Sequence, residues 1–256
     1  MCLIAVAWRV HPRWRLVLAG NRDEQHARPS APLARWADLP ILAGRDLKAG
    51  GTWLGVTDGG RVSVVTNVRD PRDPQLGASR GLLVSDFLAG NDDAATHAQT
   101  LAVHAAEYRP FNLLTFDARA GYYLGNRPGP RAQAVTPGVH ALSNAAFDTP
   151  WPKTCALSAC VEAWVAAGSD DFTPLFAALA DERPAPDVAL PDTGVGIELE
   201  RRLSPAFIRA REYGTRASTV VAIDHAGHGI IVERRFGPGG VALGETTMRF
   251  GAGNRE

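Results

Sequence analysis

The sequence predicts an α+β protein, because its expected elements come in blocks: β-hairpins, two helices, further hairpins, two further helices and a last set of hairpins. Strands and helices do not alternate regularly, as they would for a parallel sheet. Hairpins pair neighbouring strands in the antiparallel direction, so two antiparallel sheets with helices outside them fit this order. The 256 residues show no repeat and no linker-like change in composition, and we therefore expect a single domain spanning residues 1–256.

The first block predicts several short strands joined by turns. The apolar runs Cys2–Trp8 and Leu16–Gly20 flank the sequence His-Pro-Arg-Trp and form a hairpin, which ends in the polar cluster Asn-Arg-Asp-Glu at residues 21–24. A polar loop with prolines is expected from Arg28 to Pro40. The other strands of this block are expected at Ile41–Asp46, Gly50–Val56 and Arg61–Arg69, with a hairpin turn at Asp58–Gly60.

Four helices are predicted in two pairs, at Arg80–Leu88, Asp93–Glu107, Lys153–Ala167 and Thr173–Ala180. In the third of these, Leu157, Val161 and Trp164 recur on one helical face. The segment 183–196 contains three prolines and two glycines and is expected to be a mobile loop, either a lid or a surface connection. The remaining strands are expected at Asn112–Asp117, Gly121–Gly125, Val139–Asn144, Ala217–Ile223, Gly229–Arg235 and Thr246–Phe250.

Composition and charge narrow the class of protein. The 27 Lys and Arg residues balance the 27 Asp and Glu residues, so no global field attracts nucleic acid or an anionic membrane. The apolar run after Cys2 is too short to span a bilayer and is followed, not preceded, by arginines, which favours a cytoplasmic protein. Three scattered cysteines and seven scattered histidines form no pattern typical of disulfides, zinc or covalently attached haem. We expect no metal and no cofactor.

The second residue is the strongest chemical signal. If Met1 is removed, Cys2 carries a thiol and a free α-amine on the same carbon, and an amine with a pKa of about 7.7–8.0 can take the thiol proton near neutral pH. The alternative is that Cys2 is a small apolar residue that packs at the edge of a strand.

Several motifs follow Cys2 in a specific order and together span residues 2–219. They are Asn21-Arg22-Asp23-Glu24, Gly51-Thr52-Trp53-Leu54-Gly55, Thr66-Asn67-Val68-Arg69, Leu142-Ser143-Asn144, Asp148-Thr149-Pro150-Trp151-Pro152-Lys153 and Tyr213-Gly214-Thr215-Arg216-Ala217-Ser218-Thr219. On the basis of these motifs, the chain resembles the NRDE family, also called the transport and Golgi organisation protein 2 family. More distantly it resembles the penicillin V acylase and bile salt hydrolase branch of the N-terminal nucleophile hydrolases. This second resemblance implies a four-layer αββα sandwich with Cys2 at the edge of a central strand.

The resemblance also implies roles for individual residues. In that branch the N-terminal cysteine acts with an aspartate, two asparagines and an arginine, which correspond here to Asp23, Asn67, Asn144 and Arg216. The branch has a second arginine, and the corresponding position in this chain is Gly20. Arg22 lies one residue before the aspartate and is expected on the other face of the strand. Taken singly, these residues are also typical of strand ends, turns and surface ion pairs.

The chemistry of such a site can be stated from the residue types. A thiolate that attacks a carbonyl needs donors for the oxyanion, which the Asn67 or Asn144 amide could supply. Asp23 would orient the α-amine and stabilise its protonated form. Arg216 could lower the thiol pKa or hold an anionic group of the substrate.

A second set of residues is expected to bind the ligand. It consists of Asn21, Arg22, Glu24, Trp53 and Arg69. Charged side chains at a pocket rim could clamp a polar ligand without cleaving it. Trp53 could equally fill the core, and the segment 69–73 could be a solvated, charged strand end.

Two functions therefore remain open from the sequence. One is a hydrolase that cleaves an amide or thioester bond through an acyl-Cys2 intermediate. The other is a binding or trafficking protein on the same scaffold, for which the family resemblance implies haem, acyl-coenzyme A or lipid as ligand. Either way, the expected partner is a small molecule with an acyl or anionic group, and the oligomeric state is left open.

Overall fold

Two antiparallel sheets form the centre of the computed structural model, which describes residues 2–71 and 76–251. The first sheet has six strands in the order β10, β1, β2, β11, β12, β13. Their bounds are Gly138–Leu142 (β10), Cys2–Trp8 (β1), Trp14–Gln25 (β2), Tyr213–Asp224 (β11), Gly229–Phe236 (β12) and Ala242–Phe250 (β13).

The second sheet has seven strands, and its order follows the chain from β3 to β9. Their bounds are Ser30–Arg35 (β3), Leu42–Asp46 (β4), Leu54–Val56 (β5), Val62–Asn67 (β6), Phe111–Phe116 (β7), Gly121–Gly125 (β8) and Arg131–Ala134 (β9).

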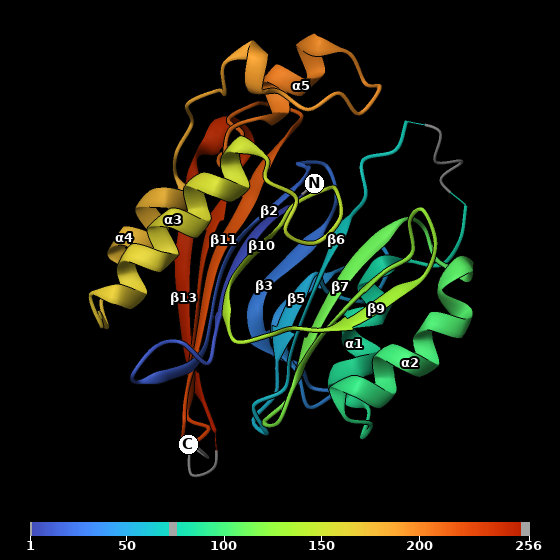
Figure 1. The fold of residues 1–256 in the computed structure, drawn as a ribbon, viewed down its shortest axis with the longest axis vertical. Coiled ribbons are helices and arrows are strands. Elements are labelled where there is room, and N and C mark those ends of the chain that lie inside the picture. The colour runs from blue at the N-terminus through green and yellow to red at the C-terminus, as the bar shows by residue number, and fades with distance from the viewer. Residues whose placement is uncertain (1, 72–75, 252–256) are drawn as a thin grey trace.

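Helices cover the outer face of each sheet. The helices are α1 (Arg80–Ala89), α2 (Ala94–His104), α3 (Pro152–Ala166), α4 (Thr173–Leu179) and α5 (Ile197–Leu203), with short 3-10 turns at Ala105–Glu107, Asp187–Ala189 and Pro238–Gly240. Helices α3 and α4 contact the six-stranded sheet, and α1 and α2 contact the seven-stranded sheet, as Figure 1 shows. These four layers confirm the predicted α+β class and αββα sandwich.

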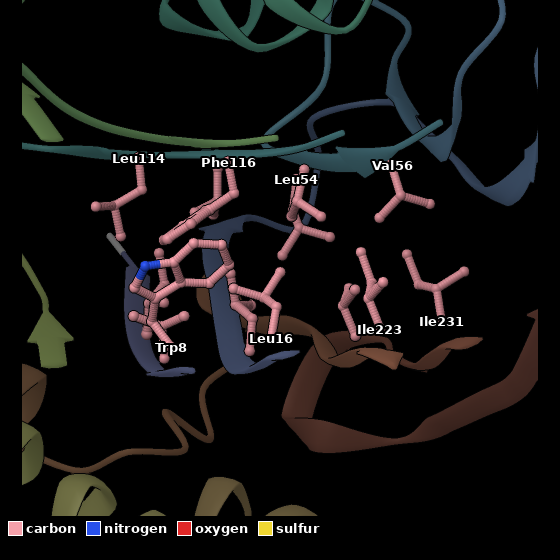
Figure 2. Close-up of a cluster of buried hydrophobic side chains, with 14 of the residues drawn as sticks. Trp8, Leu16, Leu54, Val56, Leu114, Phe116, Ile223 and Ile231 are labelled. Carbon is pink, nitrogen blue, oxygen red and sulfur yellow. The ribbon is translucent and has the colours of Figure 1, made fainter. Parts of the chain in front are cut away.

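Successive side chains of β1 point to opposite faces of the sheet, so this one apolar strand contributes to two cores. Ile4, Val6 and Trp8 point into the core between the sheets, where Trp8 lies 5.3 Å from Phe116 between ring centroids. Figure 2 shows this inter-sheet core, with Trp8, Leu16, Ile223 and Ile231 facing Leu54, Val56, Leu114 and Phe116. Leu3, Ala5 and Ala7 point the other way, into the core beneath α3 and α4. Because both faces are buried, the strand is apolar throughout.

Three elements were not predicted from the sequence. β3 lies inside the expected loop from Arg28 to Pro40 and contains Pro32, which is tolerated because β3 is an edge strand. β9 forms the opposite edge and has only four residues, and α5 is a seven-residue helix directly after the segment 183–196. Each has at most seven residues, which is too short for periodicity to identify it.

The polar cluster at residues 21–24 was expected at the end of the second strand, and the structure confirms this position. β2 continues to Gln25 and pairs with β1 on one side and β11 on the other, so the cluster lies within the sheet. Successive side chains of the cluster therefore point to opposite faces.

Among the described residues, no helix is long and apolar enough to cross a membrane.

Candidate functional site

A cavity of about 780 Å³ lies between the two sheets, at the end where β1 begins and where β2, β4 and β6 finish. Eight of the ten predicted site residues line it: Cys2, Arg22, Asp23, Glu24, Trp53, Asn67, Arg69 and Arg216. Asn21 and Asn144 are not among the described residues that line it. The structure therefore brings most of the predicted set to one place, although the members differ in what they contact.

The cavity lining is basic although the chain as a whole is neutral. Among the described lining residues nine are basic and five are acidic. The basic residues are Arg22, Arg28, Arg45, Lys48, Arg69, Arg80, Arg109, Arg216 and Arg235, and the acidic residues are Asp23, Glu24, Asp46, Asp70 and Glu233. Such an excess of positive charge in a concave site favours an anionic ligand.

Cys2 is the first residue of β1 and lies directly opposite Arg22 in the ladder with β2. It has the same parity as Ile4, so its thiol faces the space between the sheets, and the residue is only 7% exposed. Burial raises the pKa of the thiol, and the nearby guanidinium of Arg22 acts in the opposite direction. The thiol therefore needs a base before it can act as a nucleophile.

Arg22 and Asp23 lie on opposite faces of the six-stranded sheet, as the sequence predicts. Arg22 shares the cavity face with Cys2, whereas the Asp23 carboxylate accepts a hydrogen bond of 2.7 Å from Thr215 Oγ1 on β11. Burial raises the pKa of Asp23. At Gly20 a Cβ atom would lie 2.9 Å from the Leu3 carbonyl oxygen, so a side chain does not fit there. The arginine that faces Cys2 in this chain is Arg22.

The two predicted asparagines form a connected pair. Asn144 Nδ2 donates to Asn67 Oδ1 at 2.9 Å and to the Asn67 carbonyl at 3.0 Å. Because Asn67 Oδ1 accepts this hydrogen bond, the orientation of the Asn67 amide is fixed and its Nδ2 remains as the donor. Asn67 also lines the cavity. Ser143 Oγ lies 2.9 Å from the Cys2 carbonyl and 3.2 Å from Asn144 Oδ1, which ties the pair to β1. Asn144 therefore positions Asn67 from behind the cavity wall.

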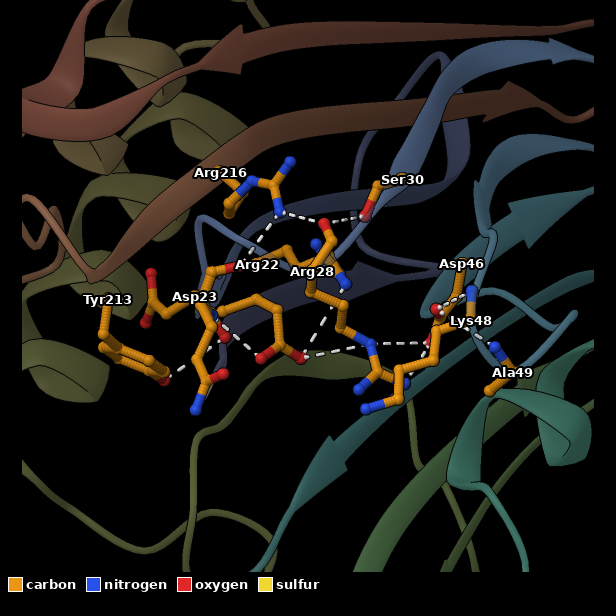
Figure 3. A network of polar contacts seen from close by, with 11 residues as sticks. Arg22, Asp23, Arg28, Ser30, Asp46, Lys48, Ala49, Tyr213 and Arg216 are labelled. Carbon is orange, nitrogen blue, oxygen red and sulfur yellow. Dashed lines mark hydrogen bonds and ion pairs between the residues drawn. The ribbon is translucent and has the colours of Figure 1, made fainter.

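A network of charged side chains extends along the cavity from Arg22 to Asp46, as Figure 3 shows. Glu24 Oε2 lies 3.8 Å from Arg22 Nη2 and 3.8 Å from Arg28 Nε, and Arg28 Nη2 is 2.6 Å from Asp46 Oδ2. The members alternate in sign and connect β2 of one sheet to β4 of the other. The network fixes the charged groups that a ligand would meet beyond Cys2.

Arg216 reaches the cavity because of an irregularity in β11. The pairing with β2 shifts between Thr215 and Ala217, which leaves Arg216 as the extra residue of a β-bulge. Its Nη1 donates to the carbonyl oxygens of Gln25 at 3.0 Å and Arg28 at 2.6 Å. It therefore stands beside the charged network, where it can meet an anionic group.

Arg69 is not part of a solvated strand end, which corrects that interpretation for the segment 69–73. Its guanidinium forms an ion pair with Glu200 of α5, and the two side chains are 6% and 3% exposed. It also lies over the Trp151 ring, at 4.8 Å from the centroid. Arg72 and Asp73 lie outside the described residues. The pair joins the end of β6 to α5, whose Leu199 and Leu203 line the cavity.

Sequence reasoning missed Lys153, which lies near Cys2 and Asp23. It stands in the first turn of α3, is 5% exposed, and its Nζ donates to the Leu203 carbonyl at 2.9 Å. Burial lowers the pKa of Lys153 to about 8, while the charge of Asp23 acts in the opposite direction. Composition offered a signal: only two of the 27 basic residues are lysines, Lys48 and Lys153.

The lowered pKa of Lys153 predicts a dependence of stability on pH. Between about pH 8 and pH 10.5 the unfolded chain binds a proton on Lys153 that the folded chain does not, so stability rises with pH there. The Lys153→Met variant should lack this rise, which amounts to about 3 kcal/mol. Urea unfolding of both proteins across this range checks it, and parallel pH profiles would contradict it.

Asn21 is placed away from the cavity, on the face of the sheet that α4 covers. Its Nδ2 donates at 2.8 Å to the carbonyls of both Leu179 and Ala206, and its Oδ1 accepts from Ser218 Oγ at 2.6 Å. All of its polar atoms are therefore used to hold the chain segments around α4, and the geometry does not support its predicted role in ligand binding.

We expect Asn21→Ala to lower the free energy of unfolding by about 2–3 kcal/mol, because it leaves buried carbonyls without donors. Ligand affinity and any turnover should be unchanged. Asn67→Ala is the matched variant, with the opposite expectation: altered activity and near-normal stability. Denaturant titrations paired with binding measurements test both, and a loss of affinity in a stable Asn21 variant would show that Asn21 acts on the ligand.

Comparisons with known proteins agree with this fold. A family model described as Transport and Golgi organisation 2 matches residues 1–238. The chain is 34% identical over 245 residues to the mouse Transport and Golgi organization 2 homolog, covering 88% of this chain and 89% of that protein. It is also 34% identical over 246 residues to the human homolog, with the same coverage.

Two solved structures share the architecture at low sequence identity. One is the Caenorhabditis elegans ortholog of N-acylethanolamine-hydrolyzing acid amidase, with a TM-score of 0.50, 12% identity and coverage of 86% of this chain and 92% of that one. The other is a cysteine-to-alanine mutant of conjugated bile acid hydrolase from Clostridium perfringens, with a TM-score of 0.53, 7% identity and coverage of 97% and 92%. On its sequence, the chain belongs to the Transport and Golgi organisation 2 family, and its fold is that of these hydrolases.

Proposed function

We propose that this protein is a cysteine N-terminal nucleophile hydrolase, which cleaves an amide or thioester bond of a small anionic molecule. The observation that carries the proposal is the position of Cys2. It begins a central strand, its thiol faces the cavity, and the Asn67 amide and the Arg22 guanidinium line the same cavity. Removal of Met1, which lies outside the described residues, is part of the proposal.

The reaction follows from these groups. The neutral α-amine of Cys2 takes the thiol proton, and the sulfur forms a bond to the carbonyl carbon of the substrate. The carbonyl electron pair moves to the oxygen and then returns, expelling the amine or thiol leaving group, which receives the proton from the α-ammonium group. Water then attacks the acyl-Cys2 thioester, gives a proton to the same amine and releases a carboxylic acid and the free thiol.

Asn67 is the donor for the oxyanion in this scheme. Its Nδ2 lies 3.5 Å from the Val68 carbonyl, a long contact that leaves the amide N–H groups available to a ligand. Asn144 keeps this orientation by donating to Asn67 Oδ1. A preorganised donor of this kind typically contributes about 3 kcal/mol to transition-state stabilisation.

The cavity lining indicates the rest of the substrate. Trp53, Leu199 and Leu203 offer apolar surface for an acyl chain, and the excess of basic residues offers sites for a carboxylate or phosphate. The solved structures with the same fold are an N-acylethanolamine-hydrolyzing acid amidase and a conjugated bile acid hydrolase. The activity of the amidase agrees with an amide bond as the reacting group.

The intact mass of gently purified protein, followed by mapping of its N-terminal peptide, tests the proposal. We expect a mass without Met1. The protein is then incubated with acyl anilides and acyl thioesters of increasing chain length, with and without a terminal carboxylate, and quenched in acid. An acyl mass on the Cys2 peptide supports the proposal, whereas retained Met1 excludes it.

A binding protein for haem, acyl-coenzyme A or lipid is the second candidate. Two considerations favour it. Burial raises the pKa of the Cys2 thiol, and the position at which the resemblance implies an arginine is Gly20, where a side chain does not fit. A carrier needs the basic cavity but not the thiol. Ligand binding by a Cys2→Ala variant, measured with haem, palmitoyl-coenzyme A and a fatty acid, together with absent turnover in the wild type, would support this function.

A further inference from the structure

The chain has a second buried amine whose charge interacts with the proposed nucleophile. Lys153 comes from the Trp-Pro-Lys sequence at the start of α3, about 150 residues from Cys2, and is 5% exposed. The chain uses arginine at 25 of its 27 basic positions, so lysine at a buried site is an exception. An arginine keeps its charge at all accessible pH values, whereas a buried lysine amine titrates readily.

Charged and titratable groups from four elements surround Lys153. They are Cys2 from β1, Asp23 from β2, Arg69 after β6 and Glu200 from α5. Arg69 and Glu200 form a buried ion pair, so their charges largely cancel. Asp23 then carries the charge opposite to Lys153. Burial raises the pKa of the Asp23 carboxyl group, and the Lys153 ammonium lowers it, with a smaller contribution from Arg22.

Asp23 also flanks the N-terminal side of Cys2. The ladder pairs Cys2 with Arg22, so Asp23 lies one position further along β2, next to the backbone nitrogen of Cys2. After removal of Met1 this nitrogen is the α-amine. Two amines then act on this carboxylate, the α-amine and Lys153.

We propose that Lys153 is a positioning residue for the reaction at Cys2: its ammonium group keeps the Asp23 carboxylate ionised while the α-amine is neutral and able to accept the thiol proton. The inference rests on the proposed function. An α-amine can act as a base only when it has lost its own proton, and at that moment it no longer offers Asp23 a positive charge. Lys153 supplies that charge instead.

The consequence of removing Lys153 follows from the same charges. Asp23 is 2% exposed, and its hydrogen bond from Thr215 does not neutralise it. Without Lys153 the α-amine would be the remaining amine beside this carboxylate, so the amine would hold its proton to higher pH. The base would then be blocked near neutral pH.

Alkylation of Cys2 by iodoacetamide across pH 5–10, followed by peptide mass spectrometry, measures this effect without a known substrate. We expect Lys153→Met to move the midpoint for Cys2 upward by about one pH unit and Lys153→Arg to restore the lower midpoint. Cys155, which is exposed on α3, is the reference thiol in every sample. Superimposed profiles of wild type and Lys153→Met would overturn the proposal.

A double variant separates an action through Asp23 from a direct effect on the thiol. In an Asp23→Asn background the additional Lys153→Met change should no longer move the midpoint. If the shift persists there, Lys153 acts directly on Cys2 and the proposed role is wrong.

Lysine-labelled protein provides a second measurement that does not depend on catalysis or on the stability of a Lys153 variant. With only two lysines, a ¹³C,¹⁵N-lysine sample gives two side-chain signals, which Lys48→Arg assigns. We expect the Lys153 signal to titrate near pH 8 and to move lower in Asp23→Asn. A Lys153 pKa near 10.5, or one unchanged by Asp23→Asn, overturns the coupling, whereas failure of hydrolysis alone leaves this result intact.

Discussion

Replacing Cys2 with alanine is expected to lower the rate of hydrolysis by a factor on the order of 10⁴–10⁶, because the variant has no nucleophile to form the acyl intermediate. Alanine fits the position, since Cys2 is a small buried residue within a ladder formed by backbone groups. The fold and the cavity should therefore be retained. Steady-state rates with the substrate identified by the adduct experiment, together with circular dichroism, measure both properties.

Cys155→Ala is the matched control, because this cysteine is exposed on α3 and should not affect turnover. Turnover that survives in Cys2→Ala would contradict the hydrolase proposal. Ligand affinity provides the second readout: it should survive in Cys2→Ala and fall when Arg22 or Glu24 is changed, since both side chains line the cavity. A wild type that shows this binding pattern without turnover would be a carrier.

Replacing Glu200 with alanine is expected to lower the free energy of unfolding by about 3–5 kcal/mol. Glu200 is the buried partner of Arg69, and it also accepts hydrogen bonds from the backbone amide of Thr193 at 3.0 Å and from its hydroxyl at 2.5 Å. Without Glu200 the buried guanidinium of Arg69 loses its carboxylate partner on α5. Because α5 carries Glu200, local detachment of α5 from the cavity should accompany the loss of stability.

Urea unfolding and limited proteolysis of the segment 183–204 test this expectation. Asp187→Ala is the matched control, because it removes an exposed ion pair with Arg201 in the same segment and should leave both readouts unchanged. A combined Arg69→Met and Glu200→Leu variant should recover most of the lost stability, since no unpaired charge remains. Normal stability of Glu200→Ala would show that Arg69 finds another partner.

The sequence predicted most of the fold because the signals are local. Short apolar runs identify β1 and β7, and β-branched residues identify β6. Helical periodicity identifies α3, where Leu157, Val161 and Trp164 are buried as expected. The elements that it missed are short and lie at edges or in connections. Their residues satisfy few packing constraints, so their sequences carry little information about conformation.

The sequence by itself determined the candidate nucleophile, the polar cluster behind it and the order of the family motifs. Only the tertiary structure decided what each residue of the cluster contacts. The pairing of β2 with both β1 and β11 turns Arg22 to the cavity and Asn21 to the helix layer, and the bulge in β11 brings Arg216 to the cavity.

The structure also decided which distant groups complete the site. Lys153 and Glu200 lie in helices far along the chain from Cys2. Their positions depend on how α3 packs against the six-stranded sheet and on how α5 contacts Lys153 and Arg69. Propensity and periodicity act over a few residues and cannot specify such contacts. A buried charge needs an opposite charge or a hydrogen bond because water cannot solvate it. Only the tertiary structure determines which charges are buried and which partners they meet.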